Sequence, residues 1–372
     1  MTHTPRISMA VFFTHDVSLE RWEQRGMLSR ELAFYQTLAQ TGMDVCLYTY
    51  GKNDGRYRNR LGPNLTLAEK TCHCPASHYA FMLPFVYWKQ LHKADLFRIH
   101  QVAGAIPALL AHWLWRKPLI VRAGFQWYRF AKKQGASRLK LWLISFIERL
   151  AYRSATSIIH TTQEDADFVA QRYHISKTKI HIIPNYVDTD LFKPLPIQKQ
   201  PRSICHVGRL EKQKNLGMLI EALQGLDAPL TIYGEGSLQR TLEEQARSFD
   251  VVVEFRGRIA NEKLPREFNA CEIFILPSLY EGHPKVLLEA MACGLAVIGT
   301  RVEGIKDIIR DGENGVLCGT DVPSIHAALA RLLEDSSTRL ELGTAARETI
   351  LQHASLLQAI RMEVGLLQHL VL

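Results

Sequence analysis

The sequence predicts an α/β protein made of two domains, each built on a parallel sheet. Its 372 residues exceed what one hydrophobic core usually serves. The 47% of hydrophobic and 22% of charged residues are ordinary for a globular protein and exclude a disordered chain. Short β-rich runs alternate with helical patterns in two series, and a polar segment rich in proline separates the two.

The first series begins with an apolar run at residues 7–13, which we expect to be a strand. Apolar side chains then recur at helical spacing over residues 28–40, Gly42 ends that helix, and residues 44–50 form the next strand. Further along, we expect a helix over residues 139–152 and strands at 118–121, 157–160 and 180–183. Strands that alternate with helices through short turns predict a parallel sheet.

The second series follows residues 188–201 (DTDLFKPLPIQKQP), which contain three prolines and favour a linker. We expect a helix over 216–223 and strands at 203–207, 230–233, 251–255, 273–276 and 296–299. The predicted domains are residues 1–185 and 202–350, joined by a hinge at 186–201, with a helix at 351–372 that packs back on the N-terminal domain. Such sheets bind ligands at the carboxyl ends of their strands, in the cleft.

The apolar runs and the cysteines indicate a cytoplasmic protein. The run at 7–13 is too short for a signal core, and no apolar stretch reaches the roughly 18 residues of a spanning helix. Seven cysteines, an odd number, favour reduced thiols rather than a disulfide framework. Cys72 and Cys74, with His73 and His78 nearby, lack a second ligand pair at zinc-site spacing, so we expect a surface loop there.

The charge is concentrated in the first half of the chain. Residues 1–185 contain 25 Lys and Arg against 12 Asp and Glu, which is +13, whereas the remainder has 20 against 25, which is −5. Basic and aromatic residues interleave between 113 and 142, a pattern that suits an anionic membrane surface or an ordinary basic surface. No nucleic-acid-binding module accompanies the charge, so we do not expect nucleic acid as a partner.

The loop after the first strand of the second domain contains Gly208, Arg209 and Lys214. A glycine allows the backbone to turn tightly off the strand. Arginine offers a planar fork that matches phosphate oxygens, and lysine adds a compact charge, so the two neutralise a diphosphate without a metal. The alternative is a solvated basic loop.

The next two strands also end in candidate loops. Gly234 lies in Tyr-Gly-Glu-Gly, which lacks the third glycine of the dinucleotide-binding motif and by itself also fits a tight turn. Arg258 and Ile259 occupy the same position after the following strand.

The segment 277–294 (PSLYEGHPKVLLEAMACG) contains two carboxylates eight residues apart. We expect Pro284 in the first turn of a helix, with Glu281 in the loop before it and Glu289 more than one turn inside. The N-terminus of that helix suits an anion. Glu281 is a candidate to accept bonds from sugar hydroxyls, and Glu289 from a second polyol such as ribose. Glu289 lies among apolar residues and therefore needs partners.

Taken in order, these motifs resemble the retaining GT-B glycosyltransferases of family four, the glycosyl transferases group 1. The resemblance rests on Glu-x7-Glu, on Gly-Arg-Leu-x3-Lys-Asn at 208–215, on Gly-Glu-Gly at 234–236 and on Phe-x-Gly at 255–257. Residues 183–194 are similar to the family's hinge, with Tyr186 where glycine is usual. Residues 303–317 are similar to its later diphosphate-side loop, with Glu303-Gly304, Lys306 and Asp307 at the places of the usual double glycine, proline and glutamate.

The resemblance implies two Rossmann-like domains that face each other across a cleft, and it implies roles for single residues. Arg209 and Lys214 hold the donor diphosphate, Glu281 contacts the transferred sugar, and Glu289 the ribose. Arg258 and Ile259 lie beside the base, and amides around 304–305 near the phosphates. The implied donor contacts also include Gly208, Gly234, Gly282, His283, Lys285 and Val286.

The first half departs more from the family pattern. Gly26 is our candidate for the family's glycine-containing loop after the first strand. Where the family often has a histidine near the reacting carbon, this chain has Gly124, and His100 is the candidate for that catalytic role or a structural histidine. Two aspartate pairs, at 165 and 167 and at 188 and 190, invite a metal, but neither ends a buried strand, so we expect neither a metal nor another cofactor.

The predicted function is the transfer of a sugar, with retention of configuration, from a nucleoside-diphosphate-sugar to a glycan or lipid-linked acceptor. It fits the synthesis of cell-surface polysaccharide or glycolipid, with the protein in the cytoplasm or peripheral on the inner face of the membrane. Two alternatives stay open: a nucleotide-sugar epimerase of the same fold, which converts donor without acceptor, and a non-catalytic module that binds nucleotide-sugar.

Overall fold

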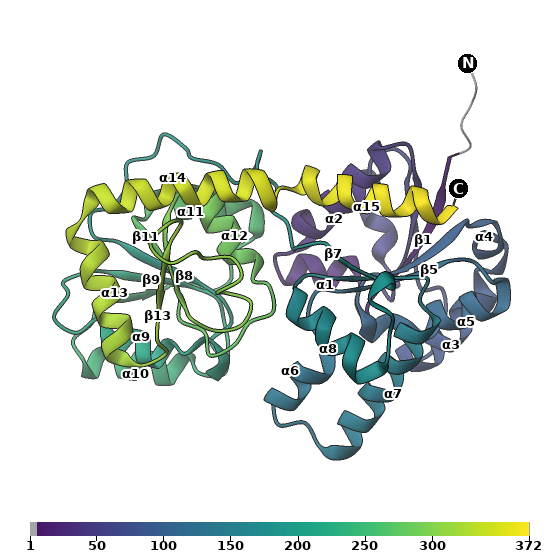
Figure 1. Cartoon of the computed structure of the whole chain (residues 1–372), viewed down its shortest axis with the longest axis horizontal. Helices are drawn as coiled ribbons and strands as arrows, with labels where there is room; N and C mark the ends of the chain where they lie inside the picture. Colours follow the sequence, from purple (N-terminus) through teal and green to yellow (C-terminus); the bar gives the residue numbers. More distant parts are fainter. Residues whose placement is uncertain (1–5, 372) are drawn as a thin grey trace. The chain divides into compact units, whose positions relative to one another are not determined.

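The computed structural model describes residues 6–371 and divides into two compact units (Figure 1). The first unit comprises Met1–Pro184 and Ala359–Leu372, and the second comprises Asn185–Gln358. Each unit contains a parallel sheet flanked by helices, which is the predicted architecture.

The sheet of the first unit has seven strands in the order β3-β2-β1-β4-β5-β6-β7, all parallel. Its central strands are buried on both faces, which explains why they are continuous apolar runs in the sequence. The strands are β1 (Ser8–Phe12), β2 (Asp44–Tyr48), β3 (Leu65–Ala68), β4 (Leu96–Ile99), β5 (Leu119–Ala123), β6 (Ser157–His160) and β7 (Ile180–Ile182).

Helices cover both faces of this sheet. Figure 1 shows α2 and α15 on one side, and α3, α5, α7 and α8 on the other. The helices are α1 (Leu19–Gln24), α2 (Leu28–Gln40), α3 (Ala76–Val86), α4 (Trp88–Lys93), α5 (Ala105–Trp115), α6 (Trp127–Lys133), α7 (Arg138–Ser154), α8 (Gln163–Tyr173) and α15 (Leu356–Val371). Short 3-10 helices are η1 (Asp54–Arg60), η2 (Val102–Gly104) and η3 (Lys177–Lys179).

A buried ion pair joins α15 to the sheet of the first unit. The Nε of Arg98 on β4 lies 2.5 Å from a carboxylate oxygen of Glu363, and Nη2 donates to the other oxygen at 3.2 Å. Arg122 on β5 lies 3.5 Å from the same carboxylate. Both members of the main pair are almost fully buried, with side chains 1% and 0% exposed. The chain therefore returns to the first unit through a charged contact that water does not reach.

The sheet of the second unit has six strands in the order β10-β9-β8-β11-β12-β13, all parallel. The strands are β8 (Ile204–Val207), β9 (Leu230–Tyr233), β10 (Val253–Phe255), β11 (Ile273–Leu276), β12 (Ala296–Thr300) and β13 (Val316–Cys318). The helices are α9 (Leu216–Ala222), α10 (Gln239–Ser248), α11 (Leu264–Ala270), α12 (Lys285–Ala292), α13 (Val322–Glu334) and α14 (Ser336–His353), with η4 (Lys212–Lys214) and η5 (Asn261–Lys263). Sequence patterns did not predict β13, because residues 316 and 317 were assigned to the segment 303–317 that resembles the family's diphosphate-side loop.

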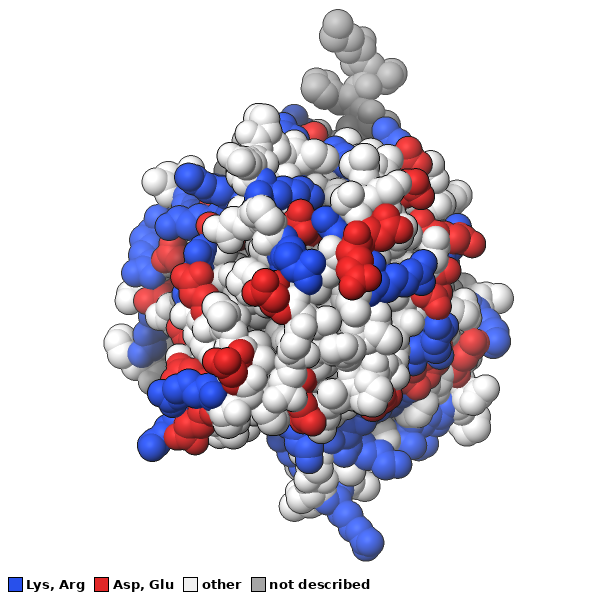
Figure 2. Space-filling model, turned by 90° about the vertical axis from the view of Figure 1, so that its left-hand side faces the viewer, with Lys and Arg blue, Asp and Glu red and all other residues white. Residues whose placement is uncertain are grey.

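Residues 186–201, which we expected as a hinge, belong to the second unit. Val187 and Phe192 are buried in one of its core clusters, and Val187 forms a β-bridge with Ser355. On the surface of the second unit, Lys and Arg are interspersed with Asp and Glu (Figure 2), as its charge balance implies.

One expectation about the cysteines is wrong. Cys72 and Cys74 form a disulfide, whereas we had expected reduced thiols throughout. The bridge closes a tight loop just before α3, and the other five cysteines are free. Among residues 6–371, no helix combines the length and the apolar character that crossing a bilayer requires.

Candidate functional site

Backbone hydrogen bonds join the loops that follow β8, β9 and β10 at the carboxyl edge of the second unit's sheet. The Gly208 amide donates to the Tyr233 carbonyl at 2.9 Å, and the Gly234 amide donates to the Gly257 carbonyl at 2.7 Å. Gly234 has a φ of +146°, and a Cβ there would overlap the Gly208 carbonyl oxygen. The glycines of the predicted motif are therefore required for close packing of the loops.

Lys214 and Glu281, two of the predicted catalytic residues, form an ion pair. The Lys214 ammonium lies 2.5 Å from Oε1 of Glu281, and the two side chains are only 10% and 9% exposed. The Ser278 hydroxyl donates to the same oxygen at 2.7 Å. The structure thus brings together, 67 residues apart in sequence, a cation suited to phosphate and a carboxylate suited to hydroxyls.

Arg209 is exposed at the same edge, and a glutamine orients it. Its Nη2 donates to Oε1 of Gln213 at 3.1 Å, and Nε2 of Gln213 donates to the Tyr280 carbonyl at 2.9 Å. The Leu279 amide in turn donates to the Gln213 carbonyl at 2.8 Å. Gln213 therefore ties the loop of Arg209 to the loop of Glu281, a role that no sequence pattern indicated.

Helix α12 begins one residue later than predicted, because Pro284 is its N-cap rather than part of the first turn. Glu289 lies inside this helix and is 1% exposed. As expected for a buried carboxylate, it has a partner: the Asn261 side-chain amide donates to its Oε1 at 2.9 Å. Asn261 is on η5, 28 residues earlier, so the sequence contained no signal for this pair.

The loop before α12 and the loop after β12 are in direct contact. Gly304 has a φ of +80°, and a Cβ there would overlap the Gly282 carbonyl oxygen. The Gly304 amide donates to Oδ2 of Asp307 at 3.3 Å. The two segments predicted to lie near the donor phosphates are thus side by side.

The remaining predicted donor contacts surround this centre. The Asn185 side-chain amide donates to the His283 carbonyl at 2.6 Å, and the Lys285 ammonium lies 4.6 Å from the centroid of the Tyr186 ring. Tyr186, which stands where the family usually has glycine, therefore stacks under a cation. Val286 packs against the core of the unit.

Arg258 and Ile259 differ in their environment. Arg258 is half exposed and donates to Glu235 at 2.9 Å, whereas Ile259 packs against a core cluster. Both follow β10 and lie at the same sheet edge as the glycine loops.

A buried histidine lies under the loop that contains Gly208 and Lys214. His206 on β8 is fully buried, its Nδ1 is 2.9 Å from the Ile275 carbonyl, and its Nε2 lies 2.8 Å from the point a Cβ on Gly208 would occupy. Burial, reinforced by the Lys214 charge, lowers the pKa of His206 to about 3. The ring is therefore neutral near pH 7 and adds no charge to the loop.

Gly26 and His100 belong to the first unit. Gly26, with a φ of +67°, ends α1 in the left-handed conformation, and its amide donates to the Glu23 carbonyl at 2.8 Å. His100 follows β4, where the Tyr35 hydroxyl lies 2.7 Å from its Nδ1 and a carboxylate oxygen of Glu31 lies 3.9 Å from its Nε2.

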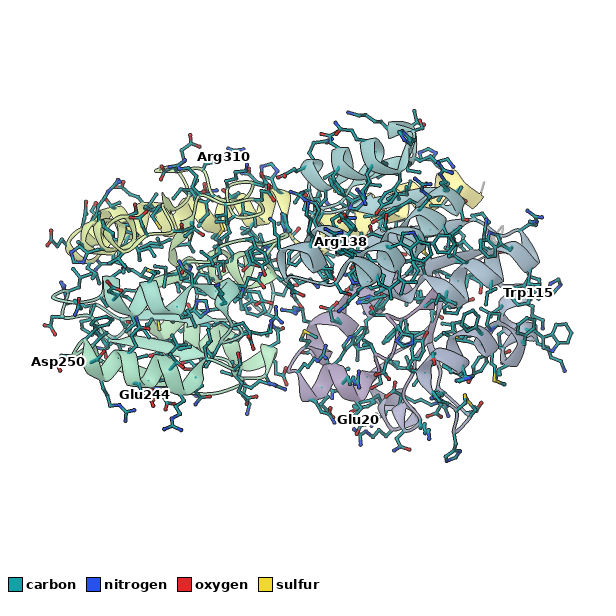
Figure 3. All side chains as sticks on the ribbon, turned by 90° about the horizontal axis from the view of Figure 1, so that it is seen from below. Glu20, Trp115, Arg138, Glu244, Asp250 and Arg310 are labelled. Carbon is teal, nitrogen blue, oxygen red and sulfur yellow. A yellow bond between two sulfur atoms is a disulfide. The ribbon has the colours of Figure 1, made fainter. Side chains whose placement is uncertain are left out.

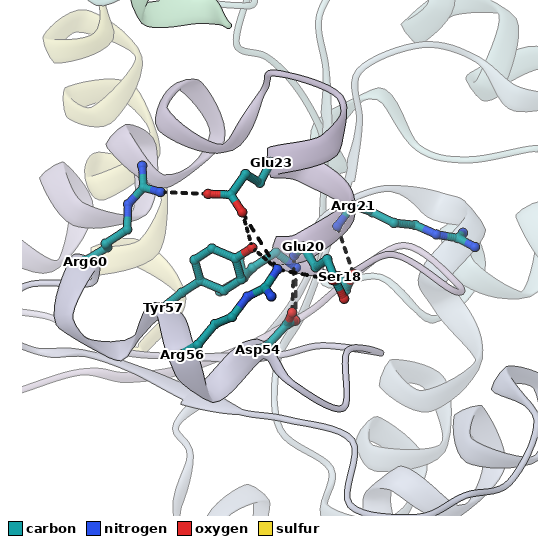
Figure 4. A network of polar contacts seen from close by, with 9 residues as sticks. Ser18, Glu20, Arg21, Glu23, Asp54, Arg56, Tyr57 and Arg60 are labelled. Carbon is teal, nitrogen blue, oxygen red and sulfur yellow. Dashed lines mark hydrogen bonds and ion pairs between the residues drawn. The ribbon is translucent and has the colours of Figure 1, made fainter.

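The segment between β1 and α2, in which Gly26 lies, contains the helix α1, and polar contacts hold it in place (Figure 4). The Asp54 carboxylate accepts the Leu19 and Glu20 amides at 3.0 and 3.2 Å and so holds the start of α1. The Tyr57 hydroxyl donates to Glu23 at 2.5 Å. These bonds from η1 anchor α1, whereas we had expected only a glycine-containing loop.

The two aspartate pairs have other partners. Arg129 donates to Asp165 at 3.0 Å, Lys177 donates to Asp167 at 2.9 Å, and Asp188 accepts the amides of Asp190 and Leu191. Among residues 6–371, no group of three or more His, Cys, Asp or Glu side chains is arranged to hold a metal ion.

Two family models match the chain. The model described as Glycosyltransferase Family 4 matches residues 31–191, and the model described as Glycosyl transferases group 1 matches residues 187–349. The chain is similar to an alpha-maltose-1-phosphate synthase from Mycolicibacterium smegmatis, at 27% identity over 57% of this chain and 62% of that protein. It is also similar to a UDP-Gal:alpha-D-GlcNAc-diphosphoundecaprenol alpha-1,3-galactosyltransferase from Escherichia coli, at 26% identity over 65% of this chain and 67% of that protein.

A solved structure resembles the whole chain. Anabaena Alr3699/HepE in complex with UDP and glucose superposes with a TM-score of 0.78 over 98% of this chain and 100% of that chain, at 18% identity. This likeness establishes the two-domain GT-B fold. The matched regions span about two thirds or less of the length of the first curated relatives.

Proposed function

Because the chain belongs to the group 1 glycosyltransferases, family four, of GT-B fold, we propose that it transfers a sugar from a nucleoside-diphosphate-sugar to an acceptor hydroxyl. The observation that carries the proposal is the Lys214–Glu281 pair, nine-tenths buried at the carboxyl edge of the second unit's sheet with Arg209 beside it. A cation suited to phosphate and a carboxylate suited to sugar hydroxyls then lie within one hydrogen bond of each other.

Arg209 and Lys214 would hold the donor diphosphate without a metal ion. The departing diphosphate gains negative charge as the bond to the sugar breaks, and fixed cations stabilise it in that state. The buried side of the loop favours this role, because charges interact more strongly where water is excluded.

The proposed reaction retains the configuration of the sugar. The bond between the anomeric carbon and the phosphate oxygen breaks, and the acceptor oxygen bonds to the same face of that carbon. The proton of the acceptor hydroxyl passes to the departing phosphate oxygen. Glu281 would orient the sugar by accepting hydrogen bonds from its hydroxyls, and Glu289 would accept hydrogen bonds from the ribose hydroxyls. His100, in the first unit, remains our candidate for a contact near the reacting carbon.

The proposed acceptor is a glycan or a lipid-linked sugar, in the synthesis of cell-surface polysaccharide or glycolipid. The support is the name of the Escherichia coli relative, whose acceptor is a diphosphoundecaprenol-linked sugar. We place the reaction in the cytoplasm, at the inner face of the membrane, because the basic and aromatic segment 113–142 suits an anionic surface.

The first test is binding of UDP, GDP and ADP and their sugar conjugates, with EDTA present, to the wild type and to Arg209→Ala. A ligand at about 100 times its Kd adds about 2.7 kcal/mol to stability. We expect one nucleotide family to stabilise the wild type and not the variant, and turnover of the variant to fall about 10²–10³-fold. Lys212→Ala is the matched control, because Lys212 lies in the same loop and is exposed, as Arg209 is, but has no predicted contact with the donor.

A variant at Arg209 with near-normal turnover would refute the assignment. Conversion of donor without acceptor would instead indicate an epimerase, and binding without release of nucleotide from any acceptor mixture would indicate a binding module.

A further inference from the structure

The first unit exposes an apolar helix. Helix α3 contains no charged residue, and its inner side packs against the unit through Tyr79, Ala80, Leu83 and Pro84. Its outer side presents four large apolar side chains that are 40–62% exposed: Phe81, Met82, Phe85 and Val86. Single exposed apolar residues are ordinary, but four on one face of one helix mark a surface that contacts something apolar.

The same side of the unit has further apolar side chains at the surface. Helix α5 packs between α3 and α7, and Figure 3 looks at this side, with Trp115 at the end of α5 and Arg138 at the start of α7. On α7, Trp142 and Phe146 are 62% and 50% exposed, and their rings stack 5.8 Å apart. Other exposed large apolar side chains are Trp88 on α4, Trp113 and Leu114 on α5, and Leu139 and Leu143 on α7.

The charge of this region is of one sign. Residues 70–147 contain twelve Lys and Arg but a single acidic residue, Asp95, whose carboxylate accepts the Ser8 amide. Seven of the twelve are exposed: Lys89, Lys93, Arg116, Lys132, Lys133, Arg138 and Lys140. An apolar surface on a segment whose exposed charged residues are all cations suits a partner whose interior is apolar and whose boundary is anionic.

We propose that the outer faces of α3 and α7 form a docking surface for an anionic lipid bilayer. The apolar side chains enter the boundary between headgroups and acyl chains, where tryptophan is favoured, and the lysines and arginines contact lipid phosphates. The segment 113–142 accounts only for the charge and part of the aromatic surface, whereas α3 supplies an apolar face that its sequence pattern did not reveal. The inference rests on the membrane placement proposed above and deepens it, and its evidence lies in the first unit and does not depend on sugar transfer.

The test is co-sedimentation of the full chain with vesicles of phosphatidylcholine alone or of phosphatidylcholine mixed equally with phosphatidylglycerol. We expect binding to the anionic vesicles, which weakens as salt is raised. The double variant Phe81→Ser, Phe85→Ser should bind about a hundredfold more weakly, because burial of each phenylalanine contributes about tenfold. A second double variant, Trp142→Ser with Phe146→Ser, should weaken binding similarly.

Leu340→Ser with Leu351→Ser is the matched control, since both leucines are exposed on α14 of the second unit, and it should bind vesicles as the wild type does. The proposal is overturned if the wild type does not bind anionic vesicles, or if the α3 variant binds them equally well. It is also overturned if the α3 variant instead abolishes a concentration-dependent dimer of the wild type, because the occupant is then a second copy. Nucleotide binding by the α3 variant should be unchanged, so that failure here is distinguishable from failure of the proposed transferase activity.

Discussion

The contact of α15 with the first unit depends on a buried charge, and we predict that Glu363→Gln strongly destabilises that unit. The carboxylate lies 2.5 and 3.2 Å from Arg98 and 3.5 Å from Arg122, whose side chains are 1% and 7% exposed. An amide of the same size leaves two guanidinium charges buried without their counter-charge. Breaking a buried pair in this way costs about 3–5 kcal/mol.

That loss is a large share of the 5–15 kcal/mol that typically stabilises a domain, and it should lower the midpoint of thermal unfolding by about 10 °C. All six tryptophans lie between residues 22 and 142, so tryptophan fluorescence in urea reports on the first unit alone. The free energy of unfolding from that signal is the quantity to compare.

The matched control is Asp167→Asn, which removes the partner of Lys177 on the surface of the same unit. These side chains are 39% and 75% exposed, and an exposed pair contributes little to stability because water screens it. The reasoning about Glu363 is refuted if Glu363→Gln changes the free energy of unfolding by no more than this control does.

Three further changes test other parts of the structure. Burial lowers the pKa of His160 from 6.5 to about 3, so the unfolded chain binds the proton first as the pH falls, and between pH 6.5 and 5 the first unit should lose about 1.6 kcal/mol that His160→Leu does not lose. Equal slopes of the free energy of unfolding against pH, from tryptophan fluorescence, would contradict this. Gly304→Ala should destabilise the second unit in calorimetry and abolish nucleotide binding, because its Cβ overlaps the neighbouring loop. Gly312→Ala has nearly the same φ but open space around it and should lower the free energy of unfolding by only about 1 kcal/mol. Equal losses in the two variants would mean that the overlap is unimportant. Glu289→Gln should weaken calorimetric binding of free nucleoside diphosphate about tenfold or more, and unchanged affinity would exclude a ribose contact.

Sequence patterns predicted most strands of the two sheets, although not β3 or β13, because buried parallel strands are continuous apolar runs and helices repeat every 3.6 residues. They also predicted which loops lie at the carboxyl edge of the second unit's sheet, since all strands of a parallel sheet end at the same edge. They did not predict which side chains meet there. Gln213 and Asn261 are ordinary polar residues in sequence, and their roles depend on bonds to residues 67 and 28 positions away.

The exposed face of α3 escaped prediction for a related reason. The simplest interpretation of an uncharged apolar helical pattern is a helix buried on all sides. Only the packing of Tyr79 and Leu83 shows that one side of α3 alone is buried. The disulfide between Cys72 and Cys74 was missed because an odd cysteine count says nothing about a pair two residues apart.

The pairing of Lys214 with Glu281 changes what the loop at residues 208–215 offers to a donor. Arg209 and Lys214 contribute two positive charges and Glu281 one negative charge, so the group carries a net charge of +1. A free nucleoside diphosphate therefore competes with Glu281 for Lys214. A nucleotide-sugar also brings sugar hydroxyls, which can donate hydrogen bonds to the Glu281 carboxylate in place of Lys214. We therefore expect Glu281→Gln to lower the rate of transfer while sparing, or even strengthening, the binding of free nucleoside diphosphate. A parallel loss of both would mean that Glu281 holds the loop in place and does not contact the sugar.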